Sequence, residues 1–560
     1  MNRHVATKAR KHETDRLGRG FVSSCFRRYL ILLSMVALAS PTLAATKAIK
    51  AGRVVDASGT VITNAVIVID NDRITSIGTG APPAGAEVID LSRFTAIPGL
   101  IDLHTHMTYF WDRAPGTRPL NQPRRPAGVT TVLAGENARR TLETGVTTVR
   151  DLGASGEVDY AMRDLINMGK MIGPRMFVAG QGISAPRAGA PALNYKEQAE
   201  TRVKAGSDWV KLYGSRGSYQ SVDTTQTVTF DEMKAAVDAA HAQNRPIAIH
   251  SYGASGVKDA VRAGADSIEH GIALDDETIA DMVKRGTVWV PTIDHNRYYV
   301  DATEEFGFAP ETTPPLRDYI EKNLESTQRA FKAGVKLGMG SDAVYTMFGQ
   351  NTRELGWFVK AGMTPAQALA TATTIPAALL GHAKDLGAIA PGYFADIVAV
   401  DGDPLADINV VIDKVRWVMK GGAVVVDRTG SGGSDEITQL VERFLLNLGN
   451  HDMDKVVADL APKAIVIVTR ERDGTWANSY QTGDEWIAAM RRNANPATFR
   501  EPLTNVTVTI DSDRIAFVRA DFQILRDGKA VSHGVDEFTL VREPSGWKFS
   551  VIAYTSMPIP

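Results

Sequence analysis

The chain has 560 residues, of which 44% are hydrophobic and 22% charged, which is typical of a soluble globular protein with two or three domains. Its 62 Lys and Arg residues nearly balance its 64 Asp and Glu residues, giving a formal charge of -2. This balance favours neither nucleic acid nor an anionic membrane as a partner, so a small-molecule partner is expected.

Residues 1–44 have the layout of a signal peptide. Basic residues through Arg27 and Arg28 precede the apolar run "YLILLSMVALA" at 29–39. This run is too short for a stable transmembrane helix, which needs about 20 residues. We therefore expect cleavage, no stable membrane anchor and an exported protein, periplasmic or secreted, with the general secretory and twin-arginine routes both open. Cys25, the single cysteine, lies in this leader, so the exported chain would have no disulfide.

Short strand patterns occupy residues 45–97, where "AVIVID" and "RITSIG" flank Asn71-Asp72, a hairpin signal. Similar strands return at 388–427, in "FADIVAV", "VRWVMKGG" and "AVVVD". The second group leaves no room for a further strand–helix unit. We therefore expect both segments to build one small flanking β-sandwich.

Between these segments, residues 98–387 alternate short strands with helical stretches such as "FDEMKAAVDAAHAQN". This alternation indicates βα units and a parallel sheet, that is, an α/β fold. Eight candidate strands can be counted: "AIPGLIDLHTH", "GVTTVRDLG", "RMFVAG", "DWVKLYG", "PIAIHSYG", "DSIEHG", "TVWVPTI" and "KLGMGSDA". Eight such units suggest a closed (β/α)8 TIM barrel, whose chemistry lies at the C-terminal ends of the strands.

The remainder of the chain is predicted to be a separate domain. Residues 428–433, within "RTGSGGSDE", are a Gly/Ser linker. Apolar residues then recur at the spacing of an amphipathic helix: Ile437, Leu440, Val441, Phe444 and Leu448. Four or more strands follow, so residues 434–560 are expected to form an α+β domain.

Residue types that bind metals stand at the ends of five of the eight predicted strands. "PGLIDLHTH", residues 98–106, places two imidazoles two positions apart, and a strand directs every second side chain to one face. A single histidine more often packs or is solvated, but coincidence at so many matching strand ends favours a metal site. The residues are His104, His106, Lys211, His250, His270 and Asp342.

Lys211 lies in the apolar stretch "WVKLY", where an ionised ammonium is costly. Burial lowers the pKa of a lysine and leaves a neutral amine, which can add CO2 to form a carbamate. The two oxygens of a carbamate would suit a bridge between two cations. The alternatives are a lysine that extends to solvent at the barrel mouth and one that pairs with Asp342.

From Ile49 to about Asp427 the chain resembles the metal-dependent amidohydrolase superfamily, in its binuclear type with a carboxylated lysine. Within it, the chain is similar to the imidazolonepropionase-like and Xaa-Pro dipeptidase-like amidohydrolases, through "PGLIDLHTH", "GVTTVRDLG", "WVKLYGSRGS", "IAIHSYG", "SIEHG", "GMGSDA" and "PGYFADIVAVDGDPLADI". The resemblance implies two divalent metal ions, with zinc expected. One ion would be held by His104, His106, Lys211 and Asp342, and the other by Lys211, His250 and His270.

Two such ions would share a hydroxide, because they lower the pKa of water and supply a nucleophile at neutral pH. Asp342 would accept the proton of that water and pass it to the leaving amine. Tyr213 lies two residues after Lys211 on the same strand face, and either donates to the oxyanion or forms a wall of the pocket.

Substrate contacts are expected from loops at the strand ends. An arginine there could bind a substrate carboxylate through both oxygens. The candidates are Arg187, Arg216 and Arg297, together with His295 and Tyr298. The Pro- and Arg-rich segment 111–128 is either a lid over the site or a loop that never orders.

Three functions follow from this pattern. The leading one is the hydrolysis of amide bonds in dipeptides (Xaa-Pro or Xaa-Lys/Arg) or N-acyl amino acids. The second keeps the metals and changes the bond to a lactone, a cyclic amide or an aromatic amide of the mycotoxin type. The third makes the C-terminal domain the working part, as a non-enzymatic ligand-binding or dimerising module.

Residues 434–560 resemble, by pattern, the SnoaL-like, nuclear-transport-factor-like cone fold. The resemblance lies in "DEITQLVERFLLNLGNHDMDKVVADLAPKAIVIV" and "GVDEFTLVREPSGWKFSVIAYTS". It implies a pocket, and a sheet through which a homo-oligomer could form or which could pack on the barrel. His451, Asp452 and His533 are candidates to line this pocket, in which no acid/base pair is evident.

Overall fold

The computed structural model describes residues 46–56, 59–114, 116–217, 221–429, 432–492, 497–511 and 514–559. The signal peptide predicted at 1–44 lies outside the described residues. Within the described ranges, each helix is too short or too polar to cross a bilayer.

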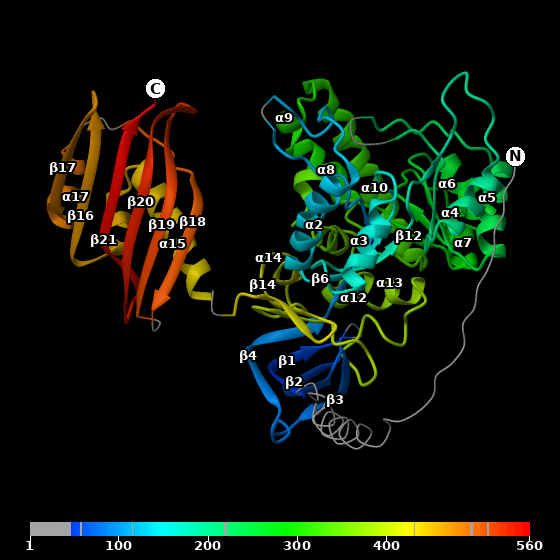
Figure 1. Ribbon diagram of the computed structural model, residues 1–560, viewed down its shortest axis with the longest axis horizontal. Coiled ribbons are helices and arrows are strands. Elements are labelled where there is room, and N and C mark those ends of the chain that lie inside the picture. The colour runs from blue at the N-terminus through cyan, green and yellow to red at the C-terminus, as the bar shows by residue number, and fades with distance from the viewer. Residues whose placement is uncertain are drawn as a thin grey trace, which may run out of the picture.

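One seven-stranded sheet joins two distant parts of the chain (Figure 1). Its order is β15-β14-β13-β4-β1-β2-β3, and β13 pairs antiparallel with β4 from Ile397↔Pro98 to Val400↔Thr95. Apolar side chains from both parts, such as Ile67 and Trp417, share one buried cluster. The strands are β1 (Lys47–Val55), β2 (Val61–Asp70), β3 (Arg73–Thr79), β4 (Glu87–Pro98), β13 (Ile397–Val400), β14 (Val415–Lys420) and β15 (Ala423–Asp427).

The central region is an α/β fold in which parallel strands alternate with helices. Three strands form one parallel sheet: β5 (Leu100–Thr105), β6 (Val146–Asp151) and β7 (Arg175–Val178). Five form another: β8 (Ile183–Ser184), β9 (Val210–Tyr213), β10 (Ile247–His250), β11 (Ser267–Glu269) and β12 (Val288–Val290).

Further backbone contacts link these two sheets. The segment 337–343 forms parallel bridges to both, Thr105↔Ala343 at β5 and Trp289↔Leu337 at β12. On the other side, the N–H of Asp208, just before β9, donates to the carbonyl of Val178 in β7 at 2.8 Å.

Helices pack on the outer faces of these strands because their apolar residues recur at helical spacing. In α6, for example, Val257, Ala260 and Val261 are buried, and the helix ends at Gly264 with a φ of 104°. The helices of this region are α2 (Ala127–Glu143), α3 (Val158–Asn167), α4 (Tyr195–Lys204), α5 (Phe230–Ala242), α6 (Ala254–Ala263), α7 (Asp276–Arg285), α8 (Ile293–Asp301), α9 (Thr303–Phe306), α10 (Thr313–Ala333), α11 (Glu354–Lys360), α12 (Pro365–Thr371), α13 (Thr374–Leu379) and α14 (Asn409–Asp413).

The C-terminal part is drawn in Figure 1 as a separate unit in yellow to red. Its helices are α15 (Gly432–Gly449), α16 (Met453–Asp459) and α17 (Gly483–Arg491). Its sheet has the order β17-β16-β21-β20-β19-β18. The strands are β16 (Leu460–Arg472), β17 (Thr475–Thr482), β18 (Leu503–Asp511), β19 (Ile515–Arg526), β20 (Lys529–Glu543) and β21 (Gly546–Pro558).

The amphipathic face predicted for residues 437–448 packs on this sheet. Ile437, Val441 and Phe444 are fully buried, and the ring of Phe444 lies 4.2 Å from that of Phe549 in β21, centroid to centroid. The core of this unit is therefore formed where α15 covers one face of the sheet.

Candidate metal centre and active-site cavity

Three of the predicted metal ligands converge at the end of β5. One ligand atom from each of His104, His106 and Asp342 lies within 4.8 Å of the others, and all three residues are buried. Oδ1 of Asp342 is 3.5 Å from Nε2 of His104 and 3.1 Å from Nε2 of His106. The backbone N–H of Asp342 donates to the carbonyl of His104 at 2.7 Å, so β5 and the segment carrying Asp342 are fixed to one another.

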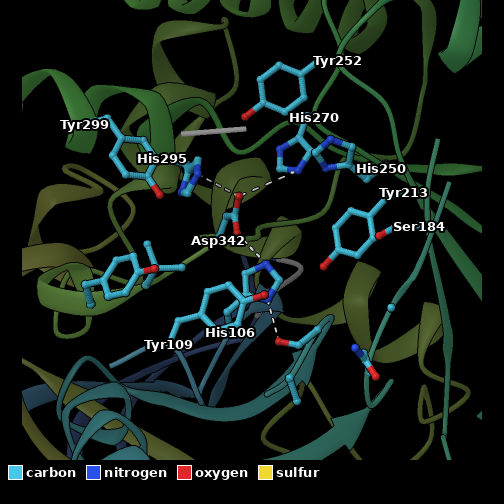
Figure 2. Close-up of a pocket in the computed structure, with 16 residues that line it drawn as sticks. His106, Tyr109, Ser184, Tyr213, His250, Tyr252, His270, His295, Tyr299 and Asp342 are labelled. Carbon is cyan, nitrogen blue, oxygen red and sulfur yellow. Dashed lines mark hydrogen bonds and ion pairs between the residues drawn. The ribbon is translucent and has the colours of Figure 1, made fainter. Parts of the chain in front are cut away.

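The second oxygen of Asp342 faces two more histidines, as Figure 2 shows. Oδ2 is 3.8 Å from Nε2 of His270 and 3.1 Å from Nε2 of His295. The His250 and His270 rings lie 4.5 Å apart, centroid to centroid. His270 and Asp342 have φ values of 65° and 51°, a left-handed conformation that is unfavourable outside glycine and typical of functional sites.

Several buried atoms of this cluster lack a hydrogen bond within the described part of the chain. They are Nε2 of His104, Nζ of Lys211, Nε2 of His250 and Nδ1 of His295. An unpartnered buried polar atom costs free energy, so a group that binds it is expected. Imidazole and carboxylate ligands suit zinc and related divalent ions, and these residues therefore fit a metal site.

The protonation states in the cluster also suit metal binding. Burial lowers the pKa of His104 to about 4, and it lowers those of His250 and His270 well below the usual range. Burial alone would raise the pKa of Asp342, but His295, His104 and His106 outweigh it and hold the pKa well below its usual range. At neutral pH the site thus offers His104, His250 and His270 as neutral imidazoles and Asp342 as an ionised carboxylate, the forms that bind metals. Burial would also lower the pKa of His106, but Asp342 outweighs it and raises that pKa.

Lys211 lies on β9 with only 1% of its surface exposed, so its side chain does not reach solvent. Burial lowers the pKa of Lys211 to about 8, although the carboxylates of Glu269 and Asp342 oppose the shift. Its Nζ atom makes no hydrogen bond to any described residue and lies 5.2 Å from the centroid of the Tyr213 ring. The amine is therefore neutral far more often at neutral pH than an exposed lysine would be.

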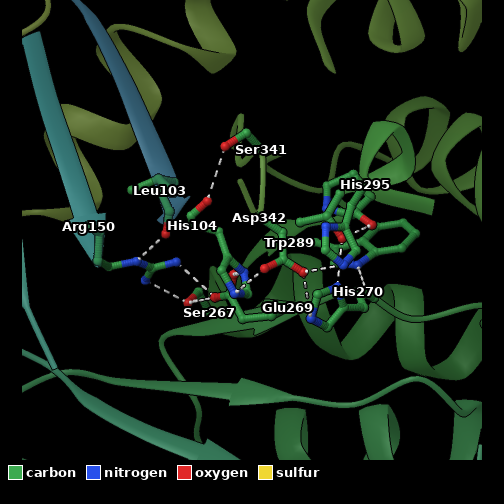
Figure 3. A network of polar contacts seen from close by, with 12 residues as sticks. Leu103, His104, Arg150, Ser267, Glu269, His270, Trp289, His295, Ser341 and Asp342 are labelled. Carbon is green, nitrogen blue, oxygen red and sulfur yellow. Dashed lines mark hydrogen bonds and ion pairs between the residues drawn. The ribbon is translucent and has the colours of Figure 1, made fainter. Parts of the chain in front are cut away.

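A buried network that the sequence did not single out supports His104 (Figure 3). Nδ1 of His104 lies 2.8 Å from Oε2 of Glu269, whose Oε1 accepts hydrogen bonds from Arg150 at 2.8 Å and Ser267 at 2.6 Å. Arg150 also donates to the carbonyl of Leu103 at 2.7 Å. The sequence feature that could have indicated Glu269 is its position next to His270 in "SIEHG", at the end of a predicted strand.

Asp102 joins the two segments that carry His104 and Asp342. Its Oδ1 accepts from the backbone N–H groups of His104 and Ser341, at 3.1 and 2.9 Å. Its Oδ2 accepts from the Ser341 hydroxyl at 2.6 Å and from Asn351 at 3.1 Å. Because Asp102 is fully buried, these four bonds hold the ligand-bearing segments in register.

The cluster opens into a cavity of about 360 Å³. Five tyrosines line it, and none of the described lining residues is Lys or Arg. The lining residues are His106, Tyr109, Gly153, Ala154, Gln181, Gly182, Ser184, Tyr213, His250, Tyr252, His270, His295, Tyr299, Asp342, Val344 and Tyr345.

The predicted substrate contacts fall into two groups. His295 lines the cavity, as does Tyr213, the predicted oxyanion donor or wall residue. Arg187 and Arg216 are exposed, and neither lines it. The remaining two residues, Arg297 and Tyr298, lie outside the lining as well.

Arg297 and Tyr298, both on α8, have other partners. Arg297 forms ion pairs with Asp294 at 2.7 Å and Asp301 at 2.6 Å. The hydroxyl of Tyr298 lies 2.8 Å from that of Thr346. The next residue along the helix, Tyr299, takes the place at the cavity that was expected for Tyr298.

The segment 111–128 borders a second cavity of about 720 Å³ beside the first. Pro119, Gln122 and Arg125 line it, and Tyr109 and Gln181 line both cavities. The segment therefore lies next to the approach to the metal cluster.

The chain is similar to a known family of enzymes. Residues 95–425, more than half of the chain, match the model of the amidohydrolase family. The chain is 28% identical over 435 residues to ochratoxinase of Aspergillus niger, covering 69% of this chain and 88% of that protein.

Two solved structures are also similar. A Xaa-Pro dipeptidase with bound methionine in its active site shares 32% identity and a TM-score of 0.61, over 68% of this chain and 99% of that one. A prolidase complexed with N-methylphosphonate-L-proline shares 26% identity and a TM-score of 0.62, over 68% of this chain and 100% of that one. The chain therefore belongs to the amidohydrolase family and is a hydrolase.

Proposed function

We propose that this protein hydrolyses amide bonds in small molecules at a centre of two divalent metal ions, with Lys211 carboxylated between them. The observation that carries the proposal is the convergence of buried ligand atoms within 4.8 Å, beside the unpartnered Nζ of Lys211 and Nε2 of His250. One ion is assigned to His104, His106, Lys211 and Asp342, and the other to Lys211, His250 and His270.

When bound, the ions would supply Lewis acidity and lower the pKa of water. Asp342 is ionised at neutral pH, because its histidine neighbours hold its pKa low, so it can accept a proton from the attacking water and pass it to the leaving amine. His295, at 3.1 Å from Oδ2, positions this carboxylate. Burial raises the pKa of Tyr213 well above its usual range, so its phenol stays protonated and can donate to the oxyanion.

The cavity supports a small substrate. A volume of about 360 Å³ suits a molecule of dipeptide size and excludes a folded protein. The solved relatives include a Xaa-Pro dipeptidase and a prolidase. We therefore assign dipeptides or N-acyl amino acids as the first substrate class, with zinc as the expected metal.

A specific feature of the wall favours a second candidate, the amide of an aromatic acyl group. Five tyrosines line the cavity, and the described lining offers no Lys or Arg to a substrate carboxylate. Aromatic rings stack well on tyrosine. The relative named ochratoxinase is consistent with such a substrate.

We further propose that residues 98–387 form a closed TIM barrel. Two links between the parallel sheets support this: segment 337–343 bridges β5 and β12, and the N–H of Asp208 donates to the carbonyl of Val178 in β7. Residues 45–97 and 388–427 would form the flanking β-sandwich, through the seven-stranded sheet that both share. Segment 111–128 would act as a lid, since it borders the approach to the site.

The remaining assignments rest on sequence pattern. Residues 1–44 would direct export and be removed, and 428–433 would link the hydrolase to a SnoaL-like cone domain at 434–560. The helix that covers one face of a six-stranded sheet supports this last assignment. A homo-oligomer would form through the same domain.

Metal analysis combined with a substrate panel tests the central proposal. Chelation should abolish activity, and Zn²⁺ or Mn²⁺ with ¹³C-bicarbonate should restore it and give a carbamate signal by NMR. In Lys211→Ala that signal and full recovery should both be absent, whereas Lys234→Ala, at a half-buried lysine on α5 that pairs with Asp238, should behave as wild type. Activity that survives exhaustive chelation would refute the metal mechanism.

The panel should contain Xaa-Pro dipeptides, Xaa-Lys/Arg dipeptides, N-acyl amino acids, aromatic amides and lactones. Higher kcat/KM for the aromatic amides than for the dipeptides would favour the second candidate. Turnover of lactones alone would exclude both.

A further inference from the structure

The C-terminal unit encloses a cavity of its own, of about 440 Å³, between its helices and its sheet. The wall combines a cluster of apolar and aromatic side chains with several charged ones. It includes Phe444 and Leu448 of α15, Trp486 of α17, and Phe522, Phe538 and Ile552 of the sheet. Such a volume and wall suit a small apolar ligand.

Two carboxyl groups, those of Glu501 and Asp536, line this cavity beside the apolar side chains. Asp536 on β20 is only 2% exposed, and its Oδ2 atom accepts no hydrogen bond from any described residue. Burial raises the pKa of Asp536 to about 7. Burial, together with the charge of Asp536, raises that of Glu501 to about 9. In this pair, the Oδ2 atom of Asp536 is thus a buried acceptor to which no described residue donates a hydrogen bond.

The residues expected from the sequence do not line this cavity, which also contains an acidic pair that the sequence did not suggest. His451 instead bonds to the carbonyl of Ala497 at 3.0 Å, and Asp452 pairs with Lys455 at 2.6 Å. His533 is also absent from the lining.

Arginines stand at the rim rather than at the carboxyl pair. Arg470, Arg472 and Arg526 line the cavity but are exposed, so their charges are hydrated. Arg470 also bonds to the hydroxyl of Tyr554, another lining residue. These cations therefore leave the inner oxygen of Asp536 without a donor.

We propose that this cavity binds a small apolar molecule that carries a protonated amine, with the ammonium donating to Asp536 and the apolar body against the aromatic wall. A carboxylate that accepts from a cation recovers much of its cost of burial, and the wall provides area for the rest of the ligand. A divalent metal ion fits less well, because a hard cation requires six or more oxygen ligands and the described wall offers only two carboxyl groups, together with three arginines and many apolar side chains. This site is independent of the hydrolase centre.

Calorimetric titration of the full chain with 2-phenylethylamine tests the proposal. We expect saturable binding of the amine and none of 3-phenylpropanoate, which has a similar body and the opposite charge. Asp536→Asn should weaken amine binding about tenfold or more, because one charge-assisted hydrogen bond is lost. Glu537→Gln removes the same charge from the next, exposed position of β20 and should bind as wild type.

Two further measurements locate the site and control for folding. Asp342→Asn, in the hydrolase cavity, should leave amine affinity unchanged if the amine binds only in the C-terminal cavity. In thermal unfolding, Asp536→Asn should have a melting temperature no lower than that of the wild type, because the variant removes a buried carboxylate whose Oδ2 atom has no hydrogen-bond partner among the described residues. Absence of amine binding, equal affinity in Asp536→Asn, loss of binding in Asp342→Asn, or tighter binding of 3-phenylpropanoate would each overturn the proposal.

Discussion

Glu269 and His104 are joined by a hydrogen bond of 2.8 Å between Oε2 and Nδ1, and both residues are fully buried. Burial alone would raise the pKa of Glu269, but Arg150 and His104 hold it at about 2, so the carboxylate is ionised. An ionised acceptor keeps the proton of His104 on Nδ1. The lone pair of Nε2 is thereby directed at Asp342 and the proposed metal centre.

Glu269→Gln should lower metal affinity about 10- to 100-fold. The amide can present an N–H to Nδ1 of His104, which favours the tautomer with its proton on Nε2 and blocks that ligand atom. Competition with a chromogenic chelator measures the affinity. Glu277→Gln, at an exposed carboxylate that pairs with Lys258, is the matched control, and equal affinities in the two variants would refute the orienting role.

The pairing of Glu269 with Arg150 predicts a distinct effect on stability. Glu269→Leu should lower the free energy of unfolding by about 3–5 kcal/mol, because Arg150 is left as a buried, unpaired cation. Arg150→Met combined with Glu269→Leu should recover most of this loss, since both charges are then absent. Urea unfolding of the single and double variants measures it. A double variant as unstable as Glu269→Leu would contradict this account.

Tyr213→Phe should lower kcat about 10²- to 10³-fold with little change in KM, if its phenol donates to the oxyanion. The reason is that the donor acts on charge that develops only in the transition state. Tyr298→Phe is the control, because this substitution also removes one phenol hydroxyl, but from a residue outside the cavity lining. Steady-state kinetics on the best amide of the panel distinguishes the two roles. If Tyr213→Phe raises KM and leaves kcat unchanged, Tyr213 is a wall residue that contributes to substrate binding only.

Features of the fold and the site that depend on the local spacing of residue types could be predicted from the sequence. His104 and His106 share a face because a strand alternates its side chains, and the helix at Ile437 shows its buried face by spacing alone. The meeting of Asp342 with these histidines also followed, since catalytic groups of βα units gather at the same strand ends.

Other features depend on contacts between distant residues and carry no local signal. Arg150 and Glu269 are far apart in sequence, and nothing near either one predicts their ion pair. Asp536 lies at an inward-facing position of β20, whose side chains alternate between buried and more exposed positions like those of many strands. Only the tertiary structure shows that its Oδ2 atom lacks a hydrogen-bond partner among the described residues. Arg297 was assigned to a substrate, but two nearby carboxylates on its own helix engage it.

The stability of the C-terminal unit should fall as the pH rises from about 4 to about 7. The pKa of Asp536 is about 7 in the folded chain against an ordinary 3.8, so across this interval the unfolded chain releases a proton that the folded chain retains. The loss that comes from Asp536, about 2–4 kcal/mol at its largest, should be absent below pH 4 and complete above pH 7. Glu501, with a pKa of about 9 in the folded chain against an ordinary 4.5, extends the fall in stability to about pH 9.

Asp536→Asn should remove this part of the pH dependence, because an amide does not titrate. Glu537→Gln should retain it, since the exposed Glu537 faces the other side of the same strand. Urea unfolding at pH 5 and pH 8, followed by tryptophan fluorescence, compares the slopes of the two variants directly. Equal slopes would mean that Asp536 is ionised in the folded chain at neutral pH and already has a partner for its charge.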